Sequence, residues 1–395
     1  MPDPNTVQTD AGGVAPEPSA PPVTITSPEI LPDHRVTFRI CAPKASEVVI
    51  EGEWIQQGRG NGGPLQRDDQ GIWSITIGPL VPDFYTYTFT VDGVPTIDPL
   101  NPTIKPGIRG LENMFLVPGE EAAFAETRAV PHGEVRIVWY QSTAVGGARS
   151  MRVYTPPGYD GSDEAYPVLY LIHGGGDDDS AWSTIGRAGF IMDNLLAAGK
   201  IEPMIVVMPN GSIPSPGFDF RLMGADRHSP SAIAARIKTI SRLHDVFVDD
   251  LLTTIIPIVE ERYRVRTTRE DRAIAGLSMG GAETLRVAPS NLDKFAYIGV
   301  FSMGLQVGAH AGVKSDFEER NANFFSDPDR TNELVKLFWI AAGEDDQIIT
   351  DGARRLSETL KRGGIQHKFN ETAGGHTWIN WRQYLYEFAQ LLFRN

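Results

Sequence analysis

Short runs in which apolar and polar residues alternate fill the chain from about residue 23 to residue 117. Turn-forming residues separate these runs, as in the stretches 67–71 and 91–93. Alternation with a period of two indicates strands that bury one face, and several such strands in about 95 residues are typical of a β-sandwich. We therefore expect an all-β, immunoglobulin-like domain over residues 23–118. Its predicted strands are residues 36–40, 47–51, 72–77, 85–91 and 114–117.

The pattern changes after a predicted linker at residues 119–133. Two runs that read as antiparallel strands come first, and continuous apolar runs then alternate with helical segments. Such alternation indicates a doubly wound, mainly parallel sheet covered by helices on both faces. We expect this α/β domain to span residues 134–395. The predicted strands are residues 136–141, 150–155, 167–172, 204–208, 272–275, 296–301 and 336–341, and the predicted helices are residues 188–198, 247–263, 282–288, 353–362 and 381–392.

Two segments do not fit either pattern. Residues 209–245 are rich in proline, glycine and mixed charge beside a predicted strand end, which suits a functional loop or a surface insertion equally well. Residues 1–22 lack the apolar core of a signal peptide and are predicted to be flexible. Tails of this composition often follow a removed export signal, so we expect a secreted or periplasmic protein. A disordered cytoplasmic tail is the alternative.

Charge and cysteine usage narrow the possible functions. The chain has 36 basic and 50 acidic residues, a formal net charge of -14, which argues against binding to nucleic acid or to an anionic membrane. No run of 18 apolar residues is present, so no membrane-spanning helix is expected. The single cysteine, Cys41, excludes an intramolecular disulfide and is expected to be a small buried residue of a strand.

The strongest chemical signal is the pentapeptide Gly276-Leu277-Ser278-Met279-Gly280. It follows a predicted strand and precedes a predicted helix, which is the context that a G-x-S-x-G nucleophile requires. A serine on such a tight turn projects its hydroxyl from the sheet edge, and the two glycines keep Cβ atoms out of the crowded turn. We expect Ser278 to be the nucleophile and the backbone N–H of Met279 to stabilise an oxyanion.

A second glycine-rich motif, His173-Gly174-Gly175-Gly176, follows another predicted buried strand. It resembles the loop of esterases that donates a backbone N–H to the tetrahedral oxyanion. Chain order places the catalytic base after the acid, so His173 is expected to orient this loop and not to act as the base.

The candidate base is His376, which lies in a glycine-rich loop between a strand-like segment and the last predicted helix. The acid that holds its tautomer is expected at the end of the strand before it. Three carboxylates follow that strand, namely Glu344, Asp345 and Asp346, and their spacing alone does not choose among them.

These motifs together resemble carbohydrate esterase family 1, the group of feruloyl and acetylxylan esterases, from about residue 135 to residue 395. Further matching segments are residues 256–265 and 375–378. The resemblance implies an α/β-hydrolase fold and a G-x-x-D turn for the acid, which selects Asp346. It also implies that Gly175 provides the first oxyanion donor. Trp182 and Trp378 are candidate substrate-binding residues.

The N-terminal domain resembles carbohydrate-binding module family 48, a module found at the N-terminus of isoamylase-type enzymes. The matching segments are residues 38–45, 71–74, 85–93 and 98–102. The resemblance implies that this domain contacts polysaccharide, and Trp54 and Trp73 are candidate sugar-stacking residues. Because all candidate catalytic residues follow Gly133, we expect the domain to be separable from catalysis on small esters.

The function implied is a secreted serine esterase that hydrolyses feruloyl or related hydroxycinnamoyl esters on arabinoxylan, without a metal or cofactor. An acetylxylan esterase, an enterochelin-type siderophore esterase and an acyltransferase are alternatives, and a non-catalytic carbohydrate-binding protein is an alternative of a different class. No HExxH, paired-cysteine or GxxxxGK motif is present. The run Asp177-Asp178-Asp179 suits a solvated or loop-capping role better than a metal site, because three successive side chains cannot all face one ion.

Overall fold

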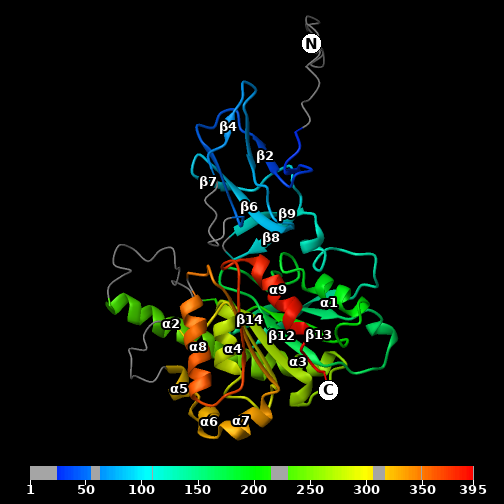
Figure 1. Cartoon of the computed structure of the whole chain (residues 1–395), viewed down its shortest axis with the longest axis vertical. Coiled ribbons are helices and arrows are strands. Elements are labelled where there is room, and N and C mark those ends of the chain that lie inside the picture. The colour runs from blue at the N-terminus through cyan, green and yellow to red at the C-terminus, as the bar shows by residue number, and fades with distance from the viewer. Residues whose placement is uncertain are drawn as a thin grey trace, which may run out of the picture.

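The computed structural model describes residues 25–54, 63–108, 110–214, 230–305, 316–347 and 349–394. Two domains are stacked along the long axis of the molecule (Figure 1). The predicted flexible segment 1–22 and residues 215–229 of the proline-rich stretch 209–245 lie outside the described residues. Within that stretch, the structure has a helix from Pro230 onwards.

The N-terminal domain consists of two antiparallel sheets that enclose one apolar core. The first sheet has the order β1-β2-β5-β4, and the second has the order β3-β6-β9-β8 with β7 paired to β6. The strands are β1 (Glu29–Ile30), β2 (Val36–Cys41), β3 (Val48–Gly52), β4 (Gln66–Arg67), β5 (Ile72–Ile77), β6 (Asp83–Val91), β7 (Val94–Thr96), β8 (Ile104–Gly107) and β9 (Gly110–Val117). The five predicted strands correspond to β2, β3, β5, β6 and β9.

The prediction that Cys41 is buried is wrong. Val36, Phe38 and Ile40 of β2 point into the core and are fully or almost fully buried. Since side chains alternate between the two faces of a strand, Cys41 falls on the opposite face and is exposed.

The second domain is built on one eight-stranded sheet with the order β10-β11-β13-β12-β14-β15-β16-β17. The pairs β10–β11 and β11–β13 are antiparallel, and all later pairs are parallel. The predicted doubly wound sheet with two leading antiparallel strands is therefore present. Its strands are β10 (Glu134–Ser142), β11 (Gly147–Thr155), β12 (Val168–Ile172), β13 (Ile205–Pro209), β14 (Arg272–Leu277), β15 (Tyr297–Phe301), β16 (Leu337–Gly343) and β17 (Lys368–Thr372).

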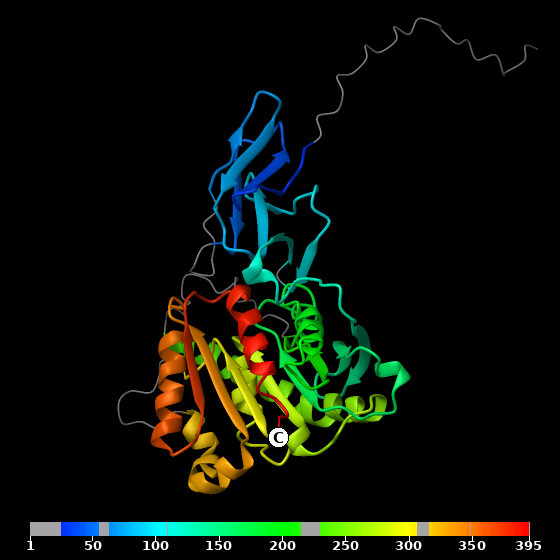
Figure 2. The ribbon, with the colours of Figure 1, turned by 45° about the vertical axis from the view of Figure 1, so that its right-hand side comes forward.

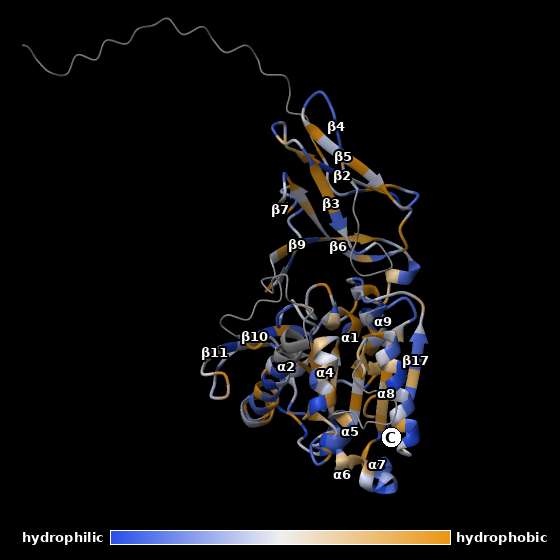
Figure 3. Cartoon of the chain, turned by 90° about the vertical axis from the view of Figure 1, so that its left-hand side faces the viewer, coloured by the Kyte–Doolittle hydropathy of each residue, from blue (hydrophilic) through white to orange (hydrophobic). Residues whose placement is uncertain are grey.

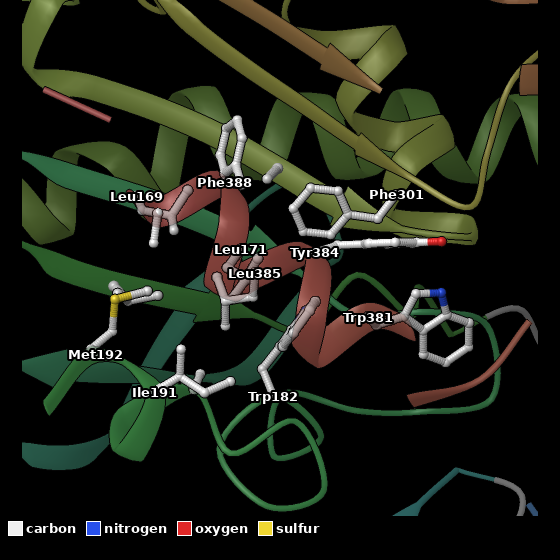
Figure 4. Close-up of a cluster of buried hydrophobic side chains, with 14 of the residues drawn as sticks. Leu169, Leu171, Trp182, Ile191, Met192, Phe301, Trp381, Tyr384, Leu385 and Phe388 are labelled. Carbon is white, nitrogen blue, oxygen red and sulfur yellow. The ribbon is translucent and has the colours of Figure 1, made fainter. Parts of the chain in front are cut away.

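Helices cover both faces of this sheet. Helices α1 and α9 pack on one face, where their side chains join Leu169 and Leu171 in one core (Figure 4). Helices α2, α3, α4 and α8 pack on the other face, which Tyr170 and Ile172 of the same strand reach by alternation. Hydrophobic residues (orange in Figure 3) follow the strands between the two helix layers. The helices are α1 (Ala188–Ala197), α2 (Pro230–Asp250), α3 (Ile256–Arg262), α4 (Met279–Val287), α5 (Asp316–Arg320), α6 (Ala322–Ser326), α7 (Pro328–Leu334), α8 (Thr350–Arg362) and α9 (Trp378–Ala389), with a π-helical turn at Leu251–Ile255 between α2 and α3. No helix in the described ranges is long and apolar enough to cross a bilayer.

The segment predicted as a linker is fixed to the second domain. Ala122 and Ala125 are completely buried, and the Asn194 side chain on α1 donates hydrogen bonds to the carbonyl oxygens of Phe124 (3.0 Å) and Glu126 (2.9 Å). The segment 119–133 therefore packs against the second domain and is part of its fold.

A buried ion pair between Asp83, the first residue of β6, and Arg382 joins the two domains. The Arg382 guanidinium on α9 donates to Asp83 Oδ1 over 2.6 and 3.0 Å, to the Phe84 carbonyl oxygen over 2.8 Å and to the Ile185 carbonyl oxygen over 2.8 Å. Arg382 is completely buried, and α9 (red in Figure 2) runs from this junction down the eight-stranded sheet. The expectation that the N-terminal domain is separable conflicts with this junction, because its removal would leave Arg382 without its carboxylate.

We predict that Arg382→Met lowers the free energy of unfolding by about 3–5 kcal/mol, because it leaves the Asp83 carboxylate buried without its cation. The measurement is chemical denaturation of the full chain. Arg330→Met is the control, since the Arg330–Glu333 pair is exposed and its loss should change stability by less than about 1 kcal/mol. Equal effects of the two substitutions would contradict a stabilising role for the junction.

Candidate active site

Ser278 occupies the sharp turn between β14 and α4. Its backbone has φ 50° and ψ -112°, a conformation that non-glycine residues rarely adopt. A Cβ atom at Gly276 would lie 2.3 Å from the carbonyl carbon of Gly280, and a Cβ at Gly280 would lie 2.6 Å from the Ile172 oxygen. The two glycines of the motif are therefore required sterically, and they allow the strained turn that exposes the serine hydroxyl.

Ser278, His376 and Asp346 form one hydrogen-bonded chain. His376 Nδ1 lies 2.7 Å from Asp346 Oδ2, and His376 Nε2 lies 3.0 Å from Ser278 Oγ. Because a carboxylate only accepts, Nδ1–H donates to Asp346, and Nε2 is left to accept from the serine hydroxyl. This is the arrangement in which a histidine can remove the proton of a serine nucleophile.

Of the three carboxylates in the acid turn, Asp346 is the one in contact with His376. Its side chain is completely buried, and its Oδ1 accepts from the Ile349 N–H over 3.2 Å. Glu344 and Asp345 are exposed. Their backbone N–H groups bond instead to the carbonyl oxygens of Thr372 (2.7 Å) and Gly374 (3.0 Å), so this part of the turn is tied to the loop that carries His376.

The loop after β12 lies directly beside the serine. A Cβ at Gly174 would lie 3.6 Å from the Cβ of Ser278, and a Cβ at Gly175 would lie 3.8 Å from the Cβ of Met279. The Asp177 N–H donates to the Gly174 oxygen over 3.3 Å, which closes a tight turn around Gly175. The two predicted oxyanion donors, Gly175 and Met279, are therefore neighbours at the serine.

His173 stabilises this loop through hydrogen bonds from its ring. Its Nε2 accepts from the Gly211 N–H over 3.0 Å, so the proton is on Nδ1, which donates to the Gly174 oxygen over 2.8 Å. His173 is 1% exposed. It therefore has the geometry expected of an orienting residue.

Sequence reasoning did not identify Trp381 as part of the site. Its ring meets the His376 ring edge to face, with centroids 4.9 Å apart, and its Nε1–H donates to Ser302 Oγ over 3.0 Å. Trp381 thus limits the movement of the imidazole. The only available signal was its position one turn into the helix that follows His376.

Trp182 and Trp378, the predicted substrate-binding residues, are core residues in this structure. They are 1% and 3% exposed, and their rings pack edge to face with centroids 5.1 Å apart. The Trp182 Nε1–H also donates to the Ile172 oxygen over 3.1 Å. Neither ring has a face open to substrate, so this prediction is corrected.

The two predicted sugar-stacking residues make contacts within the N-terminal domain. Trp73 is 8% exposed and donates from Nε1 to the Ala42 oxygen over 2.9 Å. Trp54 is partly buried, and its ring packs against Phe38 with centroids 5.4 Å apart and lies over Gly52. Trp73 is therefore a core residue, and its stacking prediction is corrected. Trp54 keeps part of its surface exposed, and its stacking role stays a prediction.

The three successive aspartates have three different partners. Asp177 pairs with Lys105 Nζ over 2.7 Å, and Asp178 Oδ1 accepts from the backbone N–H of Ser180 over 2.8 Å. Asp179 lies 4.0 Å from the Arg152 guanidinium. Asp178 therefore has the predicted loop-capping role, and Asp177 has a partner in the other domain.

The Glu53 side chain brings a carboxyl group of the N-terminal domain close to the site. Its Oε1 lies 3.5 Å from the backbone nitrogen of Trp378, two residues after His376, and its Oε2 accepts from the Thr86 N–H over 3.1 Å. Burial, with repulsion from Glu112, raises the pKa of Glu53 to about 7, although Arg382 and Lys105 oppose the shift.

This raised pKa predicts a pH-dependent stability. Between pH 4.5, its ordinary pKa, and about pH 7, the folded protein keeps a proton that the unfolded chain has lost, so stability falls as pH rises. Glu53→Gln should therefore stabilise the protein by about 1–3 kcal/mol at pH 8 and have no effect near pH 4.5; the partial exposure of the side chain reduces the gain. Thermal unfolding at both pH values tests this, with exposed Glu51→Gln as the control. A gain that is equal at both pH values would contradict the prediction.

Residues 142–391 match the family model Esterase, described as “Putative esterase”. An endo-1,4-β-xylanase/feruloyl esterase of Xylanibacter ruminicola is 31% identical over 363 residues, which cover 90% of this chain and 44% of that protein. The chain thus spans less than half the length of this relative.

Two solved structures show the same α/β-hydrolase fold. A ferulic acid esterase of Anaeromyces mucronatus, in complex with ferulic acid, is 25% identical and superposes with a TM-score of 0.55, covering 68% of this chain and 93% of that chain. The enterobactin esterase of Shigella flexneri is 15% identical, with a TM-score of 0.62 over 91% of this chain and 94% of that chain. The second likeness concerns the fold alone, and it extends over both domains.

Proposed function

The chain belongs to this esterase family, and from that premise we propose that it is a serine esterase acting on hydroxycinnamoyl esters of plant cell-wall arabinoxylan. The observation that carries the proposal is the unbroken chain from Asp346 through His376 to Ser278 beside a glycine-rich loop. Among the described residues, His132, His173 and His367 do not link a serine hydroxyl to a carboxylate in this way.

In the first half of the reaction, Ser278 Oγ attacks the ester carbonyl carbon while His376 Nε2 takes the hydroxyl proton. The resulting oxyanion accepts hydrogen bonds from the N–H groups of Gly175 and Met279. Collapse of the tetrahedral intermediate breaks the bond to the sugar oxygen, which leaves with the proton from His376. The acyl group remains on Ser278.

In the second half, His376 removes a proton from water as the water oxygen attacks the acyl carbon. The carboxylic acid leaves and the proton returns to Ser278 Oγ. Asp346 stays ionised throughout, holds the Nδ1–H tautomer and stabilises the imidazolium that forms twice in the cycle.

Two similarities support the substrate class. The Xylanibacter ruminicola relative is named for both xylanase and feruloyl esterase activities, and the Anaeromyces mucronatus structure holds ferulic acid. A contact of the N-terminal domain with polysaccharide, implied by its resemblance to a carbohydrate-binding module, belongs to the same proposal and does not rest on Trp54 or Trp73.

A siderophore ester is a second candidate. The Shigella flexneri enterobactin esterase superposes over both domains, whereas the match to the Anaeromyces mucronatus enzyme covers 68% of the chain. A feruloyl ester and an ester of an N-acyl serine both present a carbonyl carbon to a serine nucleophile. The same catalytic residues would therefore serve either substrate.

The test is product analysis on four substrates: de-starched bran, methyl ferulate, acetylated xylan and enterobactin. The proposal predicts free ferulate from the first two at rates that exceed acetate or dihydroxybenzoylserine release by at least tenfold. Faster release of dihydroxybenzoylserine would favour the siderophore ester, and faster release of acetate would favour an acetylxylan esterase. No turnover of any ester would contradict the enzyme assignment.

A further inference from the structure

Lys105 of the N-terminal domain reaches across to the glycine-rich turn beside Ser278. Its Nζ lies 2.7 Å from Asp177 Oδ1 and 2.8 Å from Glu112 Oε2. Lys105 and Asp177 are 6% and 7% exposed, so the ion pair between the domains is almost completely shielded from water. Interactions with the two carboxylates raise the pKa of the Lys105 ammonium above its ordinary value in spite of burial.

Asp177 is the last residue of the turn whose first residue is Gly174. Its N–H closes the turn, its carbonyl oxygen accepts from Ser212 Oγ over 3.2 Å, and its carboxylate is held by Lys105. The backbone of the N-terminal domain approaches the same turn, since a Cβ at Gly107 would lie 2.9 Å from the Gly176 oxygen. Strand β8 thus contacts the turn through both a side chain and its own backbone.

We propose that Lys105 is a positioning residue for ester hydrolysis: through Asp177 it fixes the Gly174–Asp177 turn so that the Gly175 N–H is held at the oxyanion. The inference rests on the serine esterase mechanism proposed above. It makes the N-terminal domain a structural part of the active site, in addition to any contact with polysaccharide.

The composition of the turn explains why an external support is needed. Three successive glycines leave the backbone with more conformational freedom than any other residues would. An oxyanion donor works only when it is preorganised, and a misplacement of about 1 Å can reduce a rate about 100-fold. His173 braces the first residue of the turn, and Lys105 braces the last one.

The positive charge of Lys105 also favours formation of the oxyanion. Without it, Asp177 would be a buried, uncompensated anion at the turn where negative charge develops in the transition state. Like charges in a shielded environment repel strongly, so the barrier would rise. Removal of both charges should therefore be less harmful than the product of the two single substitutions.

A double-mutant cycle tests the proposal in the full-length protein with methyl ferulate and 4-nitrophenyl acetate as substrates. Lys105→Met should lower kcat roughly 10- to 100-fold on both esters with KM changed less than about threefold. Lys105→Met/Asp177→Asn should lose no more kcat than Lys105→Met alone, because the two residues act as one unit. Lys44→Met, at an exposed lysine of the same domain, is the matched control and should match the wild type.

A second readout separates positioning from mere stabilisation of the fold. Phenylboronic acid forms a tetrahedral adduct with an active-site serine, and its affinity depends on the oxyanion donors. Lys105→Met should weaken inhibition by phenylboronic acid by at least tenfold at a temperature where circular dichroism shows the variant fully folded. Binding of intact methyl ferulate to Lys105→Met in a Ser278→Ala background should be unchanged within about threefold.

The inference is overturned if folded Lys105→Met retains kcat within twofold of the wild type, if its boronic acid affinity is unchanged, or if the two single effects multiply in the double variant. Failure of the proposed function gives a different result. In that case the wild-type protein itself shows no ester turnover, or Ser278→Ala remains active.

Discussion

Ser278→Ala should reduce kcat on methyl ferulate by roughly 10⁴- to 10⁶-fold while the protein remains folded. The substitution removes the Oγ atom that lies 3.0 Å from His376 Nε2, and no acyl-enzyme can then form. Residual turnover would come from the oxyanion donors and substrate binding alone. The measurement is steady-state release of ferulate, with near-ultraviolet circular dichroism to verify the fold.

The chain contains a matched control for this substitution. Ser357 Oγ lies 2.8 Å from His367 Nε2, a second serine–histidine hydrogen bond. The other ring nitrogen of His367 bonds to the Ile365 carbonyl oxygen and not to a carboxylate, and Ser357 lies within helix α8. Ser357→Ala should leave kcat unchanged within about twofold. Near-wild-type turnover of Ser278→Ala would show that the nucleophile has been assigned wrongly.

Asp346→Asn should reduce kcat by roughly 10⁴-fold, the loss seen when the orienting carboxylate of a serine triad becomes an amide. An amide placed at Asp346 Oδ2 can donate to Nδ1, which favours the tautomer whose Nε2 carries a proton and cannot accept from Ser278. The change is nearly isosteric, so the burial of the side chain should be preserved. Steady-state kinetics on methyl ferulate measure the effect.

Glu344→Gln and Asp345→Asn are the controls for the acid. Both side chains are exposed, and the contacts of these residues with the His376 loop run through their backbone N–H groups, which the substitutions keep. Each should therefore lower kcat by about tenfold or less. A crippling effect of Asp345→Asn would mean that the acid lies one residue earlier in the turn.

Local patterns in the sequence were sufficient for most of the fold. Strand β5 begins and ends at the residues that period-two alternation predicts, and the continuous apolar run at β12 is buried on both faces. Burial of Cys41 was predicted wrongly because residue type was given more weight than alternation along the strand. The π-helical turn at Leu251–Ile255 has no local signal, since one apolar pattern continues through it.

The catalytic residues could be predicted from the sequence because each must lie at a defined point of a strand–turn–helix unit. The residues that connect the domains could not be predicted in this way. Lys105, Glu53 and Arg382 are separated from their partners by 72, 325 and 299 positions, and no periodicity relates such distant residues. Trp73, Trp182 and Trp378 were misassigned for the same reason, because whether an aromatic ring faces a ligand or the core depends on tertiary packing.

Labelling with a fluorophosphonate ester tests the central assignment most directly, because this reagent reacts with activated serines and leaves a stable adduct. We expect one label per protein molecule, located by peptide mass spectrometry on Ser278, with loss of methyl ferulate hydrolysis in proportion to labelling. Ser278→Ala should not be labelled, whereas Ser357→Ala should be labelled at the wild-type rate. Label on a different serine, or full hydrolytic activity in protein labelled at Ser278, would contradict the account.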